Sequence, residues 1–282
     1  MRSLPKPTHD AGTTYELCIS KVRNVALKRK LSALKDSVER ASDEYDAEAT
    51  LGKLHLISAS EDIEGVSKKE ILKVYTNRMA KSGAPGRSVY DKILISSPQR
   101  RCPLCGQRDA STLDHYLPES RHSSLVVTPL NLVPSCKDCN FNKRAVYPNS
   151  RETETFHPYY DDFDDGFWLR AEMVQSDPVG VLFDVQRPHD WDAAKFERAN
   201  YHFKTLALSQ LYSDHAAGEL VGQKPLFKEL FEVGGSDAVR QDLEGRARSL
   251  RITRPNSWQA VLYDTAATDS WFCAGGFENI PD

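Results

Sequence analysis

The chain has 282 residues, of which 40% are hydrophobic, so it is long enough for one large globular domain or two smaller ones. Its formal net charge of −3 argues against a protein that coats nucleic acid without specificity. The sequence shows no secretory signal, and no apolar run reaches about 18 residues, so we expect neither export nor membrane insertion but a cytoplasmic protein.

The first hundred residues are predicted to be helical. Apolar residues recur at three- and four-residue steps across residues 14–53, which favours one long amphipathic helix or a helical hairpin. Ser67 and Glu70 form a capping-box pattern for a helix that runs to Ala80, where a glycine-rich segment ends it. A shorter helix is predicted for residues 89–95.

Four cysteines then form two CxxC pairs: Cys102 with Cys105, and Cys136 with Cys139. A CxxC step turns two thiolates toward one point, and two such steps complete a tetrahedral four-sulfur site that suits zinc. A site with four protein ligands leaves no open position, so this zinc is structural. Two disulfides or four unrelated core cysteines are the alternatives, and the paired spacing without a secretory signal argues against both.

Asp114 and His115 lie between the two cysteine pairs. An imidazole titrates near neutral pH, so His115 can take a proton from water, and Asp114 can hold a divalent cation that acts as a Lewis acid. Adjacent residues on a regular strand face opposite sides, so the two can share one site only at a strand end or bend, which Pro118 favours. A histidine with a purely structural role is the alternative.

With Asn131 and the run Cys139-Asn140-Phe141-Asn142-Lys143, this pattern resembles the HNH endonucleases of the four-cysteine kind. The resemblance covers residues 100–158 and is similar in particular to the HNH subunits of Septu-like anti-phage systems, which are paired with an ATPase. It implies a ββα-metal fold that holds one catalytic Mg²⁺ or Mn²⁺.

The resemblance also implies roles for individual residues. His115 would be the general base, Asn131 would tie the hairpin loop and orient it, and Asp114 and Asn140 would be the metal ligands. Asn140 stands where the family often has its final histidine, and an amide oxygen suits Mg²⁺ or Mn²⁺ better than zinc. Asn131 as a simple turn residue is the alternative.

Further candidates surround these residues. Asn142 is the alternative metal ligand, and His157 is a candidate to join the site. Four cations are either phosphate contacts or ordinary solvated charges. They are Lys143, Arg144, Arg100 and Arg101.

The sequence therefore predicts a mainly α protein with a small zinc-stapled ββα module. Residues 1–98 are predicted to be a helical region that docks a partner, 99–160 the nuclease module, and 161–282 a mainly helical region with a strand pair at 168–173 and 180–185. Residues 1–150 contain 24 Lys and Arg against 17 Asp and Glu, whereas residues 151–282 contain 13 against 23, so the first half is the one suited to phosphate. A chance asymmetry of solvated helix faces is the alternative.

The resemblance implies a metal-dependent endonuclease, with DNA as the expected substrate and an ATPase that supplies target recognition and restraint as the expected partner. An effector that cleaves RNA, such as tRNA, would use the same residues. A zinc-knuckle module that binds nucleic acid or protein without catalysis is the third alternative.

Overall fold

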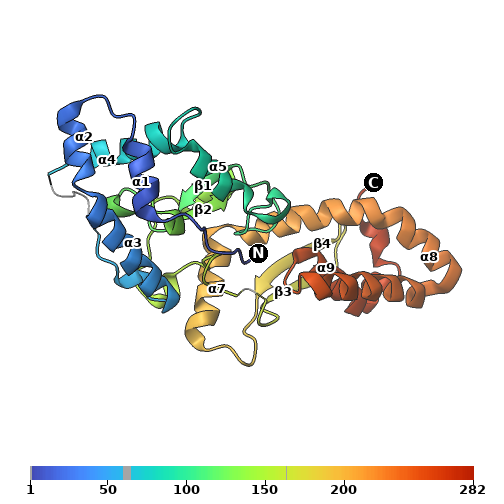
Figure 1. Cartoon of the computed structure of the whole chain (residues 1–282). Helices are drawn as coiled ribbons and strands as arrows, with labels where there is room; N and C mark the ends of the chain where they lie inside the picture. The colour runs from blue at the N-terminus through green and yellow to red at the C-terminus, as the bar shows by residue number, and fades with distance from the viewer. Residues whose placement is uncertain (1, 60–64, 163) are drawn as a thin grey trace. The chain divides into compact units, whose positions relative to one another are not determined.

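The computed structural model describes residues 2–59, 65–162 and 164–282. The chain divides into two compact units, Met1–Asp162 and Phe163–Asp282 (Figure 1). The described residues are mainly helical, and each unit contains one small two-stranded sheet. In these ranges, none of the helices has both the length and the apolar character that crossing a bilayer requires.

Most α-helices of the N-terminal unit come before its sheet. They are α1 (Ala11–Ile19), α2 (Val25–Ser32), α3 (Lys35–Thr50), α4 (Lys68–Tyr75), which a π-helical turn (Thr76–Ala80) extends, and α5 (Arg87–Ile95). The prediction of one helix or a hairpin over residues 14–53 is wrong, because the segment divides among three helices. Side-chain N-caps explain where α1 and α2 begin. The side chain of Asp10 accepts from Thr13 N, and that of Asn24 accepts from Leu27 N.

The helices predicted for residues 67–80 and 89–95 are present as α4 with its π-helical turn and as α5. Ser67 is the N-cap of α4, as predicted, but its side chain makes no capping hydrogen bond among the described residues. The start of α4 therefore depends on its buried face, which includes Ile71 and Val74, more than on a cap.

These helices share one hydrophobic core with the cysteine-rich module. Buried members from both are Tyr15, Leu31, Leu34, Val38, Ile71, Val74, Met79, Val89, Ile93, Leu113, Val126, Val127 and Leu132. Tyr75 Oη donates to Leu113 O (3.3 Å), and Leu113 N donates to Tyr90 Oη (3.3 Å). Residues 1–98 and 99–160, predicted as separate regions, therefore lie in one compact unit, because burial of their apolar surfaces holds them together.

The module itself has the order ββα. Strand β1 (Thr112–His115) pairs antiparallel with β2 (Leu132–Ser135), so that Asp114 lies opposite Val133 and His115 opposite Leu132, and α6 (Lys137–Lys143) follows directly. Short 3₁₀ turns occur in this unit at Leu54–Leu56, Pro98–Arg100, Ser123–Leu125, Pro129–Asn131 and Arg151–Thr153. Two of these turns belong to the long loop between β1 and β2.

The C-terminal unit starts with an antiparallel hairpin, β3 (Leu169–Val174) and β4 (Gly180–Val185), where the strand pair is predicted. Its helices are α7 (Ala193–Thr205), α8 (Leu208–Thr253), α9 (Trp258–Thr268) and α10 (Ser270–Cys273), followed by a 3₁₀ turn at Gly276–Asn279. Helix α8 turns back on itself (Figure 1), and Gly235 supplies the positive φ of 65° that interrupts it.

Candidate functional site

The two cysteine pairs meet at one point. The four Sγ atoms lie within 4.8 Å of one another, and all four residues are buried. Cys136 is the N-cap of α6, and its Sγ accepts from Cys139 N (3.3 Å), while Cys102 O accepts from Gly106 N (2.8 Å). None of the four forms a disulfide, which argues against the disulfide alternative. Four converging soft thiolate donors are consistent with a structural Zn²⁺.

Asp114 and His115 occupy the end of β1, the position that lets adjacent residues serve one site. Both are buried, at 5% and 8% exposure. Beyond the strand, Tyr116 N donates to Asn131 O (2.8 Å), and there the chain leaves the sheet. A carboxylate and an imidazole thus occur on adjacent residues at a strand end, and both are largely shielded from water.

Lys143, at the end of α6, reaches both residues. Its Nζ lies 3.0 Å from Asp114 Oδ2 and donates to His115 O (2.7 Å), and the lysine is only 4% exposed. Desolvation raises the pKa of Asp114, and the ammonium of Lys143 opposes that shift. Lys143 is therefore a buried partner of Asp114, which contradicts its prediction as a phosphate contact.

His115 is held through one ring nitrogen. Nε2 lies 2.8 Å from Val126 O, and the ring edge contacts Tyr75, with 4.5 Å between ring centroids. Desolvation lowers the pKa of His115 to about 4, and the nearby charge of Lys143 adds to that shift, while the bond to Val126 O opposes it. At neutral pH the imidazole is uncharged and has one nitrogen lone pair, and its low pKa makes it a weaker base than a solvated histidine.

Asn131 closes the loop that contains the partners of His115. It is fully buried; its Oδ1 accepts from Leu117 N (2.7 Å), and its Nδ2 donates to Leu117 O (3.0 Å) and to Leu125 O (3.4 Å). Because Leu125 precedes the acceptor of His115, these bonds tie the start and the middle of the loop together. Any effect of Asn131 on the imidazole passes through this backbone.

The predicted metal ligand Asn140 is half-buried on α6. It lies three residues before Lys143, so the two share a helix face, and Lys143 brings that face to Asp114. Asn142 is also half-buried and lies two residues further along α6, so it projects from a different side of the helix.

The other predicted residues lie at the surface or in the core. Arg100 and Arg144 are exposed, the latter over the ring of Phe141 (5.3 Å), and Arg101 pairs with Asp109 (2.8 Å). His157 is buried: its Nε2 lies 2.9 Å from Tyr45 Oη, and its Nδ1 accepts from Tyr159 N. Since both its ring nitrogens are engaged, His157 serves packing rather than chemistry.

Sequence reasoning missed two side chains around His115. Tyr75 reaches it from α4, and Glu119 Oε2 lies 3.7 Å from its Nε2. Glu119 follows Pro118, which the sequence marks as a bend, but nothing in the spacing indicates that the chain turns back toward the imidazole.

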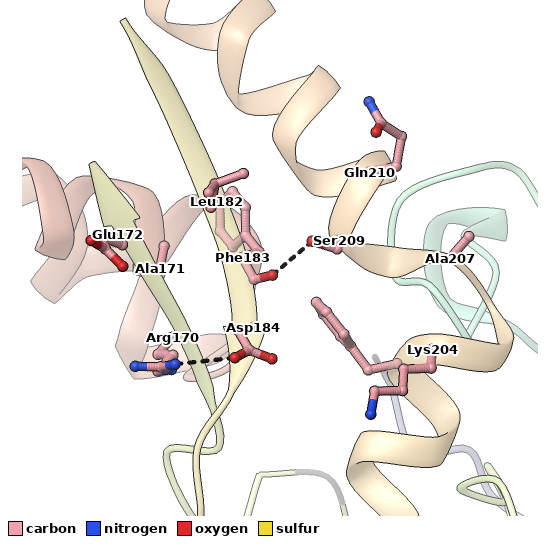
Figure 2. Close-up of a pocket in the computed structure, with 11 residues that line it drawn as sticks. Arg170, Ala171, Glu172, Leu182, Phe183, Asp184, Lys204, Ala207, Ser209 and Gln210 are labelled. Atoms are coloured by element: carbon pink, nitrogen blue, oxygen red, sulfur yellow. Dashed lines mark hydrogen bonds and ion pairs between the residues drawn. The ribbon is translucent and has the colours of Figure 1, made fainter. Parts of the chain in front are cut away.

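A separate pocket of about 620 Å³ lies in the C-terminal unit, between the β3–β4 hairpin and the junction of α7 with α8 (Figure 2). Ser209 Oγ donates to Phe183 O (2.8 Å) at its edge, and Arg170 pairs with Asp184 (3.0 Å). Its lining combines apolar side chains, such as Phe183, with the charged side chains of Glu172 and Lys204.

Replacing Lys143 by methionine should destabilise the N-terminal unit by about 3–5 kcal/mol, because Asp114 would remain buried without its counter-charge. Urea unfolding of the zinc-loaded protein measures the change. The exposed Arg144→Met is the matched control and should cost less than about 0.5 kcal/mol. Adding Asp114→Leu to Lys143→Met should restore much of the loss; a loss below about 1 kcal/mol for Lys143→Met alone would contradict the pairing.

The chain is similar over its full length to Protein ea31 of Escherichia phage lambda. The two are 26% identical over 296 residues, which span 98% of this chain and 100% of the phage protein. No model of a protein family matches the chain, and no solved structure matches it. The full-length coverage means that both units have counterparts in the phage protein.

Proposed function

We propose that this chain is a divalent-metal-dependent endonuclease of the HNH type that hydrolyses phosphodiester bonds. One observation supports the proposal most strongly: the buried Asp114 and His115 are adjacent at the end of β1, in a module that contains a cluster of four cysteines. Hydrolysis of a phosphodiester needs a base that deprotonates water, and His115 is suited to that task.

His115 and the residues around it would have separate roles in the reaction. With the Nε2 proton donated to Val126 O, the lone pair of the imidazole is on Nδ1, which would take the proton of the attacking water. A divalent cation held by Asp114 and Asn140 would supply Lewis-acid stabilisation of the phosphate and of the departing oxygen. The ammonium of Lys143 now occupies this carboxylate, so a cation that binds Asp114 would displace Lys143 from it.

A second function is favoured by one observation. Lys143 already neutralises Asp114, and this pair would stabilise a module that binds nucleic acid or protein without cutting it. In that case zinc would be the protein's only metal, and Asp114 and His115 would be structural. The nuclease would bind Mg²⁺ or Mn²⁺ at Asp114, whereas the binding module would not.

We propose DNA as the substrate, with Arg100, Arg101 and Arg144 as phosphate contacts at the exposed rim of the module. An ATPase partner that restrains the nuclease is part of the same proposal, since an unrestrained nuclease would damage its own cell. The similar protein belongs to a phage. This origin supports a role in conflict between phages and bacteria, in which such a protein could serve the phage as well as the bacterium.

The substrate follows from one assay. The zinc-loaded protein is incubated with plasmid DNA and with total cellular RNA, in Mg²⁺, in Mn²⁺ and without either ion, each with and without a candidate ATPase partner. We expect the DNA to be cut only when a divalent cation is present. Cutting of RNA alone would overturn the choice of substrate, and no cutting under any condition would favour the binding module.

A further inference from the structure

His115 has two oxygen atoms on one side of its ring. Nε2 lies 2.8 Å from Val126 O and 3.7 Å from Glu119 Oε2. A lone pair on Nε2 would face both oxygens and be repelled, so the ring proton belongs on Nε2. The tautomer of His115 is therefore set by the loop that follows β1.

A tight turn brings Glu119 back toward His115. The backbone N–H groups of Arg121 and His122 both donate to Pro118 O, at 2.9 and 3.0 Å. On the other side of Pro118, the Asn131 side chain bonds both backbone groups of Leu117. Hydrogen bonds on both sides of Pro118 therefore fix the backbone next to Glu119.

The carboxylate of Glu119 has an unusual environment. Its Oε2 is buried and has no hydrogen-bond partner in the described part of the chain, and 3.7 Å is too long for a hydrogen bond to His115. Buried polar atoms in native proteins nearly always have partners, so an exception points to a functional role or a bound group. The imidazole of His115, 3.7 Å away, is one ionisable group beside this oxygen, and Tyr75 is another close enough to feel its charge.

We infer that Glu119 is a positioning residue which, together with Val126 O, holds the His115 ring in the Nε2–H tautomer and directs Nδ1 toward the substrate. The catalytic role of this arrangement rests on the proposed nuclease function, whereas the tautomer of His115 does not depend on it. Val126 O fixes the donor direction, and the Glu119 carboxylate disfavours the flipped ring that would place a lone pair against it. It would also face the ring as the ring gains positive charge during proton transfer.

The tautomer can be observed without any activity. Long-range ¹H–¹⁵N spectra of the zinc-loaded full chain, labelled at histidine, distinguish the two tautomers, and the His115 signals are assigned by their loss in His115→Gln. We expect the Nε2–H form in the wild type. Glu119→Ala should lower the ratio of the Nε2–H to the Nδ1–H form by about tenfold, because the charge that repels a lone pair on Nε2 from 3.7 Å is removed. Glu119→Gln, which keeps an oxygen there, should restore most of it.

The matched control is Glu44→Ala, which removes an exposed glutamate from α3 of the same unit. It should change neither tautomer nor stability. An unchanged tautomer in a folded Glu119→Ala protein would overturn the inference, because Val126 O alone would then be sufficient. If the wild type cuts nucleic acid, Glu119→Ala should also lower kcat by about tenfold with little change in KM. Absence of cutting would refute the nuclease proposal and leave the tautomer result to decide the role of Glu119.

Discussion

Replacing Cys136 by serine should abolish zinc binding and unfold the ββα module. A structural zinc contributes on the order of 10 kcal/mol to a small metal-stapled fold, and β1, β2 and α6 offer only 4, 4 and 7 residues of regular structure without it. Zinc content measured by mass spectrometry should fall from one ion per chain to none. Hydrogen exchange should accelerate throughout residues 102–143.

The control for this variant is Cys273→Ser in the C-terminal unit. The Cys273 thiol donates to Ala266 O, a bond that a serine hydroxyl can replace, so zinc content and hydrogen exchange in the module should not change. A Cys136→Ser protein that keeps a full equivalent of zinc would contradict the assignment of the four cysteines as zinc ligands.

Replacing His115 by alanine should lower metal-dependent cleavage by about 10² to 10⁴, the usual contribution of a positioned general base. The reason is the uncharged state of the buried imidazole, whose lone pair on Nδ1 would take a proton from water. Single-turnover rates on the polymer that the wild type cuts measure the loss. Zinc content and the unfolding midpoint are recorded in parallel, so that loss of fold is not mistaken for loss of catalysis.

The matched control for His115 is His189, whose side chain is fully exposed in the C-terminal unit. His189→Ala should cut at the wild-type rate. If His115→Ala also cut at that rate while retaining its fold, the imidazole would have no catalytic role, and the base would have to be sought elsewhere.

The features predictable from sequence are those encoded by local spacing. Each CxxC pair turns two thiols toward one point, so the spacing along the chain predicts that the four thiols converge. The structure confirms that Cys102, Cys105, Cys136 and Cys139 cluster. Alternation of apolar residues likewise located the β3–β4 hairpin. The end of β1 at His115 agrees with the expectation that Asp114 and His115 could share one site only at a strand end or bend.

Features that depend on distant contacts were not predictable. The break-up of residues 14–53 into α1, α2 and α3 depends on the cap at Asn24 and on the core that the helices build with the module. The composition of that segment is helical throughout, so it hides the breaks. The same core joins the regions predicted as 1–98 and 99–160 into one unit.

In the candidate site too, contacts between residues distant in sequence could not be predicted. Spacing along α6 places Lys143 on the face of Asn140, but it does not say whether that face is turned to solvent or to β1. The structure turns it inward, so a cation expected at the surface becomes the buried partner of Asp114. Glu119 was missed because only the turn after Pro118 brings it to His115.

A crystal structure of the protein grown with Mn²⁺ tests the central claim most directly, because anomalous scattering distinguishes manganese from zinc. We predict zinc about 2.3 Å from the four cysteine sulfurs and manganese bound by oxygens of Asp114 and Asn140, with Lys143 Nζ moved away from its present 3.0 Å contact with the Asp114 carboxylate. Zinc at the cysteines with Lys143 still on Asp114 and no manganese there would contradict the nuclease site and leave a zinc-stapled binding module.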